Sequence, residues 1–296
     1  MQVPSFAKIN WTLEILGRRP DGYHELRTIL QTVDVCDDLT FSSAESQILL
    51  TCDNPAVPCD ETNLIFRASL LLRELTGCDK GANIHLTKRI PMGAGLGGGS
   101  SNAAVALLAL IRLWDLEVAP QDLLAMGAKL GADVPFFFFG GTGIGIGRGD
   151  EVYPMDDITS DYLLLVNPGI NVPTKEIYGN LPSMLTRAPA LNKIPHSLAL
   201  AYAHNMKLPL QLRNDLEVPA LSLFPEIGKV KQRLVALNAT QVLMSGSGST
   251  VFAVFESEAA CVQAQEKLQP TGWWCEKTRT LDRNAYQAAL RFFRNA

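Results

Sequence analysis

The pattern of hydrophobic and polar positions in the first half of the chain predicts a mixture of strands and helices. Segments rich in β-branched and aromatic residues, separated by turn signals, predict strands at 6–16, 28–35, 38–41 and around Ile84 and Leu86. Helices are expected at 64–75, at 103–114, which is apolar nearly all round, and from Pro120 to a stop at Gly131. A short buried strand is expected over 136–139, followed by a glycine-rich hairpin at 140–149.

The second half of the chain alternates strands with longer helical segments. Strands are expected at 162–166, 241–244, 251–255 and 273–278, and helices at 225–237, 258–268 and 283–294. This order predicts an α+β fold whose second half is ferredoxin-like. An acidic turn at 156–161 marks the expected boundary between two domains, 1–157 and 158–296, with the last helix a candidate to pack back on the first domain.

Composition and charge narrow the classes of function. The 296 residues are 47% hydrophobic, carry a formal net charge of -4 and have a pI of about 5.6. Proteins that coat nucleic acid or anionic membranes need a positively charged surface. We therefore expect neither nucleic acid nor a membrane as a partner. The six cysteines include no close CxxC pair, which predicts reduced thiols. The sequence shows neither a signal-peptide pattern nor an apolar stretch of about 20 residues, so a cytoplasmic protein is expected.

A glycine-rich segment directly before the buried helix is the strongest chemical signal in the chain. Its residues are Pro91, Met92, Gly93, Ala94, Gly95, Leu96, Gly97, Gly98, Gly99, Ser100 and Ser101. Glycines let the backbone approach a ligand closely, and the free amides of a helix start attract anions. The segment therefore predicts a phosphate cradle, although a tight turn in which Ser100, Ser101 and Asn102 cap the helix is the simpler alternative.

Two other phosphate-binding loops fit this segment less well. A P-loop requires a lysine directly after the glycines, and none follows here. Gly93, Gly95 and Gly98 do spell GxGxxG, which is typical of dinucleotide-binding oxidoreductases. That motif needs a second strand within about 20 residues, and the helix at 103–114 leaves no room for it.

Three motifs, in order along most of the chain, resemble those of the GHMP kinase superfamily, which includes galactokinase, homoserine kinase and mevalonate kinase. They are AKIN at 7–10, the glycine-rich segment at 91–101 and LMSGSGSTVFAVF at 243–255. DGYH at 21–24, with GLGGGSSNAA at 95–104 and GADVPFF at 131–137, resembles the branch that phosphorylates a cytidine diphosphate conjugate of methylerythritol in the non-mevalonate isoprenoid pathway.

The resemblance implies a two-domain GHMP kinase fold, with a ribosomal-protein-S5-like amino-terminal domain, ATP on that domain and the active site between the domains. The implied reaction is phosphorylation of the 2-hydroxyl of the cytidine diphosphate conjugate. Mg²⁺ is expected with the nucleotide, and either Ser100 or Ser101 can reach it, but no acidic residue is an obvious metal ligand. A monomer or homodimer is expected.

The resemblance also assigns roles to single residues. Asp133 is the expected general base, and Lys8 is expected to keep it ionised and to steady the transferred phosphate. Without the resemblance, a turn cap and a solvated strand lysine are the simpler interpretations. The residues expected to bind the acceptor are Asn10, Tyr23, His24, Thr174 and Tyr178, with Tyr23, His24 and Tyr178 around the cytosine.

Two alternatives stay open at this stage. One is another small-molecule kinase of the superfamily, of the homoserine or mevalonate type. Substrate profiling would separate this kinase from the branch that phosphorylates the cytidine diphosphate conjugate. The other alternative is a non-catalytic binding protein on the same scaffold, which RNA affinity without ATPase or kinase activity would identify.

Overall fold

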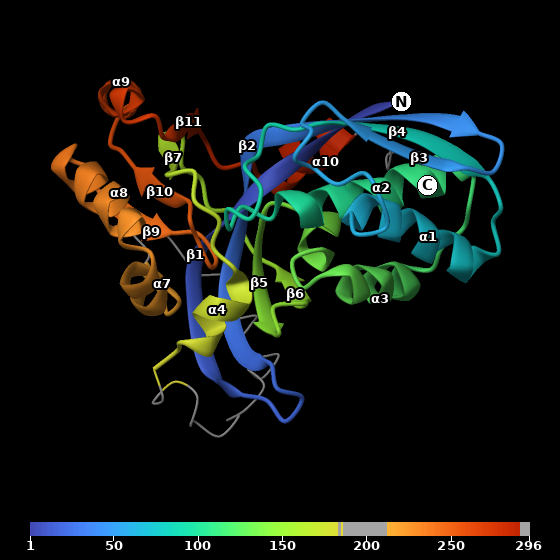
Figure 1. Cartoon of the computed structure of the whole chain (residues 1–296), viewed down its shortest axis with the longest axis horizontal. Helices are drawn as coiled ribbons and strands as arrows, with labels where there is room; N and C mark the ends of the chain where they lie inside the picture. The colour runs from blue at the N-terminus through green and yellow to red at the C-terminus, as the bar shows by residue number, and fades with distance from the viewer. Residues whose placement is uncertain (183–184, 186–211, 291–296) are drawn as a thin grey trace.

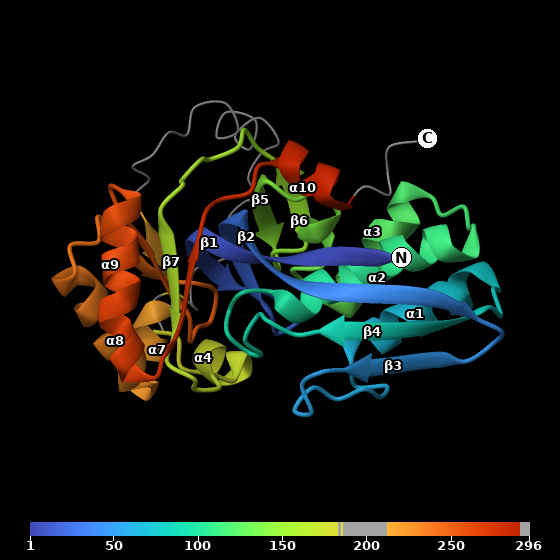
Figure 2. The same ribbon diagram turned by 90° about the horizontal axis from the view of Figure 1, so that it is seen from above.

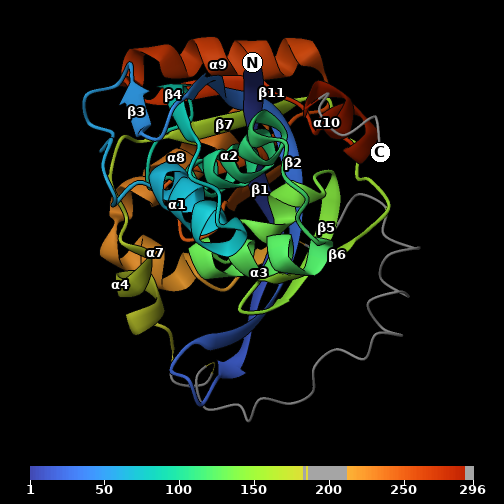
Figure 3. The same ribbon diagram turned by 90° about the vertical axis from the view of Figure 1, so that its right-hand side faces the viewer.

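A seven-stranded sheet forms the larger half of the computed structural model, which describes residues 1–182, 185 and 212–290. Its strands are β1 (Gln2–Arg18), β2 (His24–Ala44), β3 (Ile48–Cys52), β4 (Gly81–Thr87), β5 (Thr142–Gly147), β6 (Glu151–Pro154) and β8 (Arg213–Asn214). The order is β3-β4-β2-β1-β8, with β5 also paired to β2 and β6 paired to β5. The hairpin end of β1 and β2 reaches past α3 in Figure 3.

Three helices lie together beneath β3 and β4 in Figure 1. They are α1 (Leu64–Thr76), α2 (Gly98–Trp114) and α3 (Pro120–Leu130). Asn63 caps α1 through its side chain, and α3 begins with a proline and ends at Gly131 as expected. Twelve of the 17 residues of α2 are buried, because this helix lies in the core between the sheet and its two neighbours.

The smaller sheet has four strands in the order β11-β7-β10-β9, all antiparallel. They are β7 (Leu163–Asn167), β9 (Gln241–Met244), β10 (Val251–Val254) and β11 (Trp274–Thr278). The helices of this half are α4 (Thr174–Gly179), α7 (Glu217–Leu223), α8 (Pro225–Ala236), α9 (Glu258–Leu268) and the short η2 (Gln269–Thr271). This strand order and its helical crossovers confirm the ferredoxin-like prediction and the α+β class.

The two sheets share an apolar contact. Ile9 and Trp11 of β1 are fully buried in one cluster with Leu165 and Phe252 of the smaller sheet. The rings of Trp11 and Phe252 meet edge to face at 5.4 Å between centroids. Figure 2 shows α8 and α9 at one end of the molecule and α1 and α2 at the other. The two sheets are therefore joined by a packed apolar contact.

The last described helix, α10 (Arg283–Leu290), lies against the larger sheet. Its Tyr286 is buried beside Phe6 of β1, with 5.7 Å between ring centroids. The last four residues of the helix expected at 283–294 lie outside the described part of the chain. The boundary at 157/158 stays a prediction, and β8 joins the first sheet although it follows that point in the sequence.

Two expectations about local structure were wrong. The segments 28–35 and 38–41 belong to one 21-residue strand, β2, because the register shift opposite Phe6 and Ala7 bends the strand without ending it. Residues 135–138 form a short 3-10 helix, η1 (Pro135–Phe138), instead of a strand. There the amide of Phe137 bonds the carbonyl of Val134, and apolar periodicity cannot separate such a buried turn from a strand.

Candidate active site

The glycine-rich loop leads directly into α2, which begins at Gly98, five residues earlier than expected. Gly97 is the residue before the helix, with φ of 68°, and no side chain caps the first turn. A helix start leaves its first amides without partners inside the helix. The simpler interpretation of Ser100 and Ser101 as helix caps is therefore wrong, and the open amides of this turn can bind phosphate oxygens.

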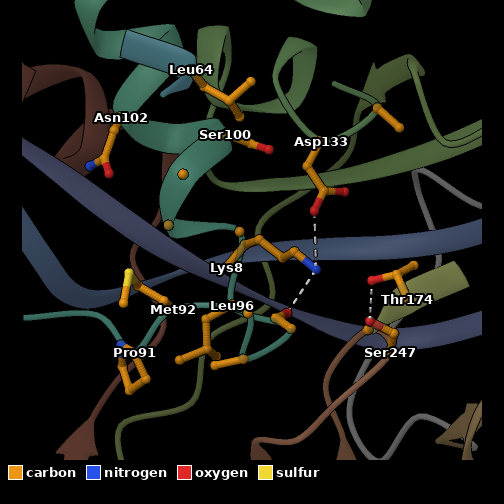
Figure 4. Close-up of a pocket in the computed structure, with 18 of the residues that line it drawn as sticks. Lys8, Leu64, Pro91, Met92, Leu96, Ser100, Asn102, Asp133, Thr174 and Ser247 are labelled. Atoms are coloured by element: carbon orange, nitrogen blue, oxygen red, sulfur yellow. Dashed lines mark hydrogen bonds and ion pairs between the residues drawn. The ribbon is translucent and has the colours of Figure 1, made fainter. Parts of the chain in front are cut away.

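A cavity of about 520 Å³ opens over this loop. Every loop residue from Pro91 to Ser100 lines it, together with Lys8, Asn10 and Asp133. Figure 4 shows Lys8 and Asp133 facing each other beside this loop. Ser101 is the exception, because its fully buried hydroxyl accepts a hydrogen bond from Ser5 at 2.8 Å. The backbone amide of Ser101 bonds the carbonyl of Gly97, so this residue supports the loop from behind.

Lys8 and Asp133 meet at the edge of this cavity. The Lys8 Nζ lies 3.4 Å from a carboxylate oxygen of Asp133, and it also donates to Asn10 Oδ1 at 2.7 Å and to the Gly95 carbonyl at 2.9 Å. Lys8 is 3% exposed and Asp133 is 34% exposed. The ammonium is thus fixed by three oxygens, while the carboxylate stays open to a ligand (Figure 4).

A chain of hydrogen bonds along β1 and β2 fixes Asn10, which in turn accepts from Lys8. Asn10 donates to the hydroxyl of Thr28 at 2.7 Å, which in turn donates to the carbonyl of Thr12 at 2.6 Å. Asp133 lies between the end of α3 and the start of η1. Strand β1 and this helical turn therefore present the lysine and the aspartate to one point, as expected for a site that works on a bound phosphate.

Residues 245–249 of the third motif pack directly against the glycine loop. The Ser245 hydroxyl donates to the Gly95 carbonyl at 2.9 Å, and the amide of Thr250 bonds the carbonyl of Ala94 at 3.2 Å. Gly95 has φ of 75°, and a Cβ placed on it would collide with the carbonyl oxygen of Ser245. The two backbones can therefore meet only because this residue is glycine.

A second cavity, of about 1060 Å³, adjoins the first. Tyr23 and His24 line it, and Thr174 and Tyr178 line both cavities. The rings of His24 and Tyr178 lie 5.3 Å apart between centroids, while Thr174 shares a 2.9 Å hydrogen bond with Ser247 at the rim. The structure thus places all five residues expected to bind the acceptor along two connected cavities, with Asn10 at the Lys8 end.

One polar atom of the second cavity, the buried Nε2 of His24, has no hydrogen-bond partner among the described residues. Burial, helped by the charge of Arg18, lowers the pKa of His24, so the ring is neutral at pH 7. Burial, with the nearby charge of Asp133, raises the pKa of Tyr178, whose phenol therefore keeps its proton. A neutral ligand edge, such as a base, suits these groups.

Sequence reasoning missed several residues of the two cavities. An apolar wall beyond the glycine loop consists of Val57, Pro58, Leu64 and Leu86. Lys88 and Arg148 also line the site, and the Arg148 guanidinium lies 5.2 Å from the centroid of the Tyr23 ring. The sequence held a signal only for Lys88, which lies three residues before the start of the glycine segment at Pro91.

The cavities offer few ligands to a metal ion. Among the residues that the structure describes, Asp133 is the single carboxylate that lines the cavity over the glycine loop, and it is paired with Lys8. Within the described residues, no group of three or more His, Cys, Asp or Glu side chains can hold a metal. These donors do not fit a Mg²⁺ site built by the protein alone.

No helix in the described ranges is long and apolar enough to cross a membrane.

Comparisons with known proteins agree with this geometry. The profile of the GHMP kinases N terminal domain matches residues 63–141, and that of the GHMP kinases C terminal matches residues 191–272. The chain is 41% identical over 283 residues to 4-diphosphocytidyl-2-C-methyl-D-erythritol kinase of Geobacter sp. (strain M21), covering 95% of this chain and 99% of that protein.

Solved structures show the same relationship. A crystal structure of 4-(cytidine 5'-diphospho)-2C-methyl-D-erythritol kinase matches with a TM-score of 0.77 and 36% identity, over 95% of this chain and 100% of that one. Homoserine kinase from Cytophaga hutchinsonii matches with a TM-score of 0.64 and 19% identity, over 95% of each chain, and shares the fold alone. The chain therefore belongs to the GHMP kinases and, within them, to the 4-diphosphocytidyl-2-C-methyl-D-erythritol kinase family.

Proposed function

We propose that this kinase transfers the γ-phosphate of ATP to the 2-hydroxyl of 4-diphosphocytidyl-2-C-methyl-D-erythritol, giving the 2-phosphate and ADP. The observation that carries this proposal is the Lys8–Asp133 pair, which lines the first cavity beside the glycine loop. Ala132, the neighbour of Asp133 in the chain, lines both cavities. One cavity suits a nucleotide triphosphate and the other suits the base of the acceptor. Relatives that bear this activity in their names cover nearly the whole chain.

The chemistry needs alignment and charge stabilisation more than covalent help. Asp133 accepts the proton of the 2-hydroxyl as its oxygen attacks the γ-phosphorus. The new oxygen–phosphorus bond forms while the bond from the γ-phosphorus to the bridging oxygen of ADP breaks. Lys8, held by Asn10 and Gly95, places its ammonium where negative charge gathers on the transferred group.

The nucleotide lies in the first cavity, with its phosphates at the glycine loop and its adenine at the apolar wall. The open amides of Gly98, Gly99 and Ser100 face the phosphates, and the wall of Val57, Pro58 and Leu64 offers an apolar surface for adenine. Mg²⁺ would arrive bound to the nucleotide phosphates, and the Ser100 hydroxyl, which lines the cavity, could serve as a ligand from the loop. No step of the proposed transfer depends on a metal ligand from the protein.

The acceptor fits with its cytosine in the second cavity and its hydroxyl at Asp133. The unpartnered Nε2 of His24 can hydrogen-bond the base, and the aromatic faces of Tyr23 and Tyr178 can stack on it. Asn10, near the reacting group, can bond the acceptor beside its 2-hydroxyl. A cytoplasmic location and a monomeric or homodimeric state stay predictions.

The test is a kinase assay with three acceptors: the cytidine diphosphate conjugate, mevalonate and homoserine. We expect kcat/KM for the conjugate to exceed the other two by about 100-fold or more, because only it satisfies the groups of the second cavity. Asp133→Asn should reduce kcat by about 100-fold to 10,000-fold. Asp122→Asn, in the same domain but lining neither cavity, is the matched control. Preference for mevalonate or homoserine, or full turnover in Asp133→Asn, would refute the proposal.

A further inference from the structure

Asp37 is a fully buried carboxylate on β2, behind the nucleotide loop. One of its oxygens accepts hydrogen bonds from the backbone amides of Arg89 and Ile90, both at 2.8 Å. The other accepts from the Lys88 ammonium at 2.6 Å and from the Asn102 side chain at 3.0 Å. Neither the general base nor the acceptor site uses this residue, so its four hydrogen bonds need a separate explanation.

These hydrogen bonds join the two ends of the glycine loop. Lys88, Arg89 and Ile90 lead directly into Pro91, where the loop begins. Asn102 lies in the first turns of α2, just after the loop ends. A single carboxylate therefore fixes both ends, and Asn102 extends the link by donating to the Ser5 hydroxyl at 2.9 Å. The loop between these two ends keeps its shape only while both of them are bonded to Asp37.

Lys88 connects this arrangement to the cavity. Its ammonium, on a side chain only 6% exposed, donates to Asp37 and to the Ile90 carbonyl at 2.5 Å. An ammonium has three N–H donors, so one remains beyond these two bonds. Lys88 lines the cavity, and its Nζ would lie 3.2 Å from a Cβ placed on Gly98, the first residue of α2. Asp37 thus holds a positive charge beside the open amides of the helix start.

We propose that Asp37 is a positioning residue for nucleotide binding, which sets the shape of the 91–101 loop and the place of the Lys88 ammonium. It does not touch the nucleotide and acts through the Arg89 and Ile90 amides, Lys88 and Asn102. This inference rests on the proposed function only in that the cavity over the loop holds a nucleotide. A merely structural carboxylate would stabilise the fold without a selective effect on that cavity.

Calorimetric titration with ADP and, separately, with CDP tests the inference without turnover of any acceptor. In Asp37→Asn we expect ADP to bind about 10-fold or more weakly, since a charged acceptor of four hydrogen bonds is lost, while CDP affinity changes less than about twofold. Asp157→Asn is the matched control, because Asp157 also accepts from two backbone amides, those of Thr142 and Arg283, and lines neither cavity. It should lower the melting temperature and leave both affinities within about twofold.

Unchanged ADP affinity in folded Asp37→Asn, or equal weakening of ADP and CDP, would overturn the inference. Because loss of one partner leaves a buried charge unpaired, that variant can fail to fold. The double variant Asp37→Asn/Lys88→Met removes both charges, and Lys88→Met alone is its reference. We expect the double variant to bind ADP more weakly than Lys88→Met, since the amide and Asn102 anchors are also weakened. Equal ADP affinity in these two variants would contradict a role for Asp37.

Discussion

The phenol hydroxyl of Tyr286 donates a 2.6 Å hydrogen bond to the backbone carbonyl of Phe137. Tyr286 is fully buried in α10, and Phe137 lies in η1, the turn that begins two residues after Asp133. The last described helix of the chain therefore supports the turn that directly follows the proposed general base. Residues almost 150 positions apart in the sequence meet at one side of the active site.

Tyr286→Phe keeps the ring packing and removes only this hydrogen bond. The Phe137 carbonyl loses a partner in the interior, so we expect the free energy of unfolding to fall by about 1–3 kcal/mol. Because η1 is adjacent to Asp133, kcat should fall several-fold while the KM for ATP stays nearly constant. Denaturant unfolding and steady-state kinetics measure both effects, and a variant equal to wild type in both would show that the bond is unimportant.

Gly95→Ala should damage the contact between the glycine loop and residues 245–249. The new Cβ would meet the Ser245 carbonyl, at a residue whose φ is 75°. We expect a loss of about 2–4 kcal/mol in stability and at least a tenfold loss of kcat/KM for ATP.

Gly272→Ala is the matched control for backbone strain. Gly272 has φ of 72°, and nothing lies within 4 Å of a Cβ placed there. It should cost only about 1–2 kcal/mol and leave activity unchanged. If the two variants behave alike, left-handed backbone strain alone explains the effect and the close approach to Ser245 does not matter.

The pattern of the sequence was enough to predict the class of fold and a glycine-rich loop at the start of a buried helix, and phosphate binding by that loop stays a prediction. A run of glycines at a helix start favours a loop whose backbone approaches a ligand closely. The alternation of strands and helices in the second half of the chain indicates the ferredoxin-like sheet. The local errors have physical causes. The bulge opposite Phe6 and Ala7 hides the continuity of β2, and a buried 3-10 turn at Pro135–Phe138 has the same apolar run as a strand.

The supporting residues of the site could not be predicted from spacing. Asp37 and Lys88 are 51 positions apart and meet only because β2 and β4 pair. The apolar wall at Val57 and Leu64 comes from a loop and a helix start that carry no motif. Lys8, Asp133, Tyr23 and His24 were named through a family resemblance, and their roles stay predictions until they are tested.

Lowering the pH should weaken binding of the acceptor base through His24. Its pKa lies below the ordinary value of about 6.5, so the ring is neutral at pH 7 and gains a proton only as the pH falls through that lowered value. Protonation removes the ring's acceptor nitrogen, so CDP affinity should drop between pH 7 and pH 5. The unfolded chain takes up this proton at a higher pH, so the contribution of His24 to stability also falls below about pH 6.5.

His24→Gln provides the control for this pH dependence, since titration of the ligand itself affects both proteins equally. The ratio of wild-type to variant CDP affinity should therefore decrease toward low pH. A ratio that is constant from pH 7 to pH 5 would show that the charge of His24 plays no part in binding.

Lys8→Met should impair the chemical step more than substrate binding. The ammonium is expected to stabilise charge on the transferred phosphate, so kcat should fall by about 100-fold to 1,000-fold with a much smaller change in KM. Lys80→Met is a matched control, because Lys80 also donates to a backbone carbonyl, that of Trp114 at 2.7 Å, and lines neither cavity. A change in KM alone for Lys8→Met would assign this lysine to binding.

A crystal structure with a non-hydrolysable ATP analogue and CDP bound together tests the central claim most directly. The account predicts phosphate oxygens on the amides at the start of α2, the γ-phosphorus facing Asp133 and Lys8, and the cytosine beside His24 in the second cavity. A nucleotide bound away from the 91–101 loop, or an Asp133 carboxylate directed away from the γ-phosphate, would contradict it.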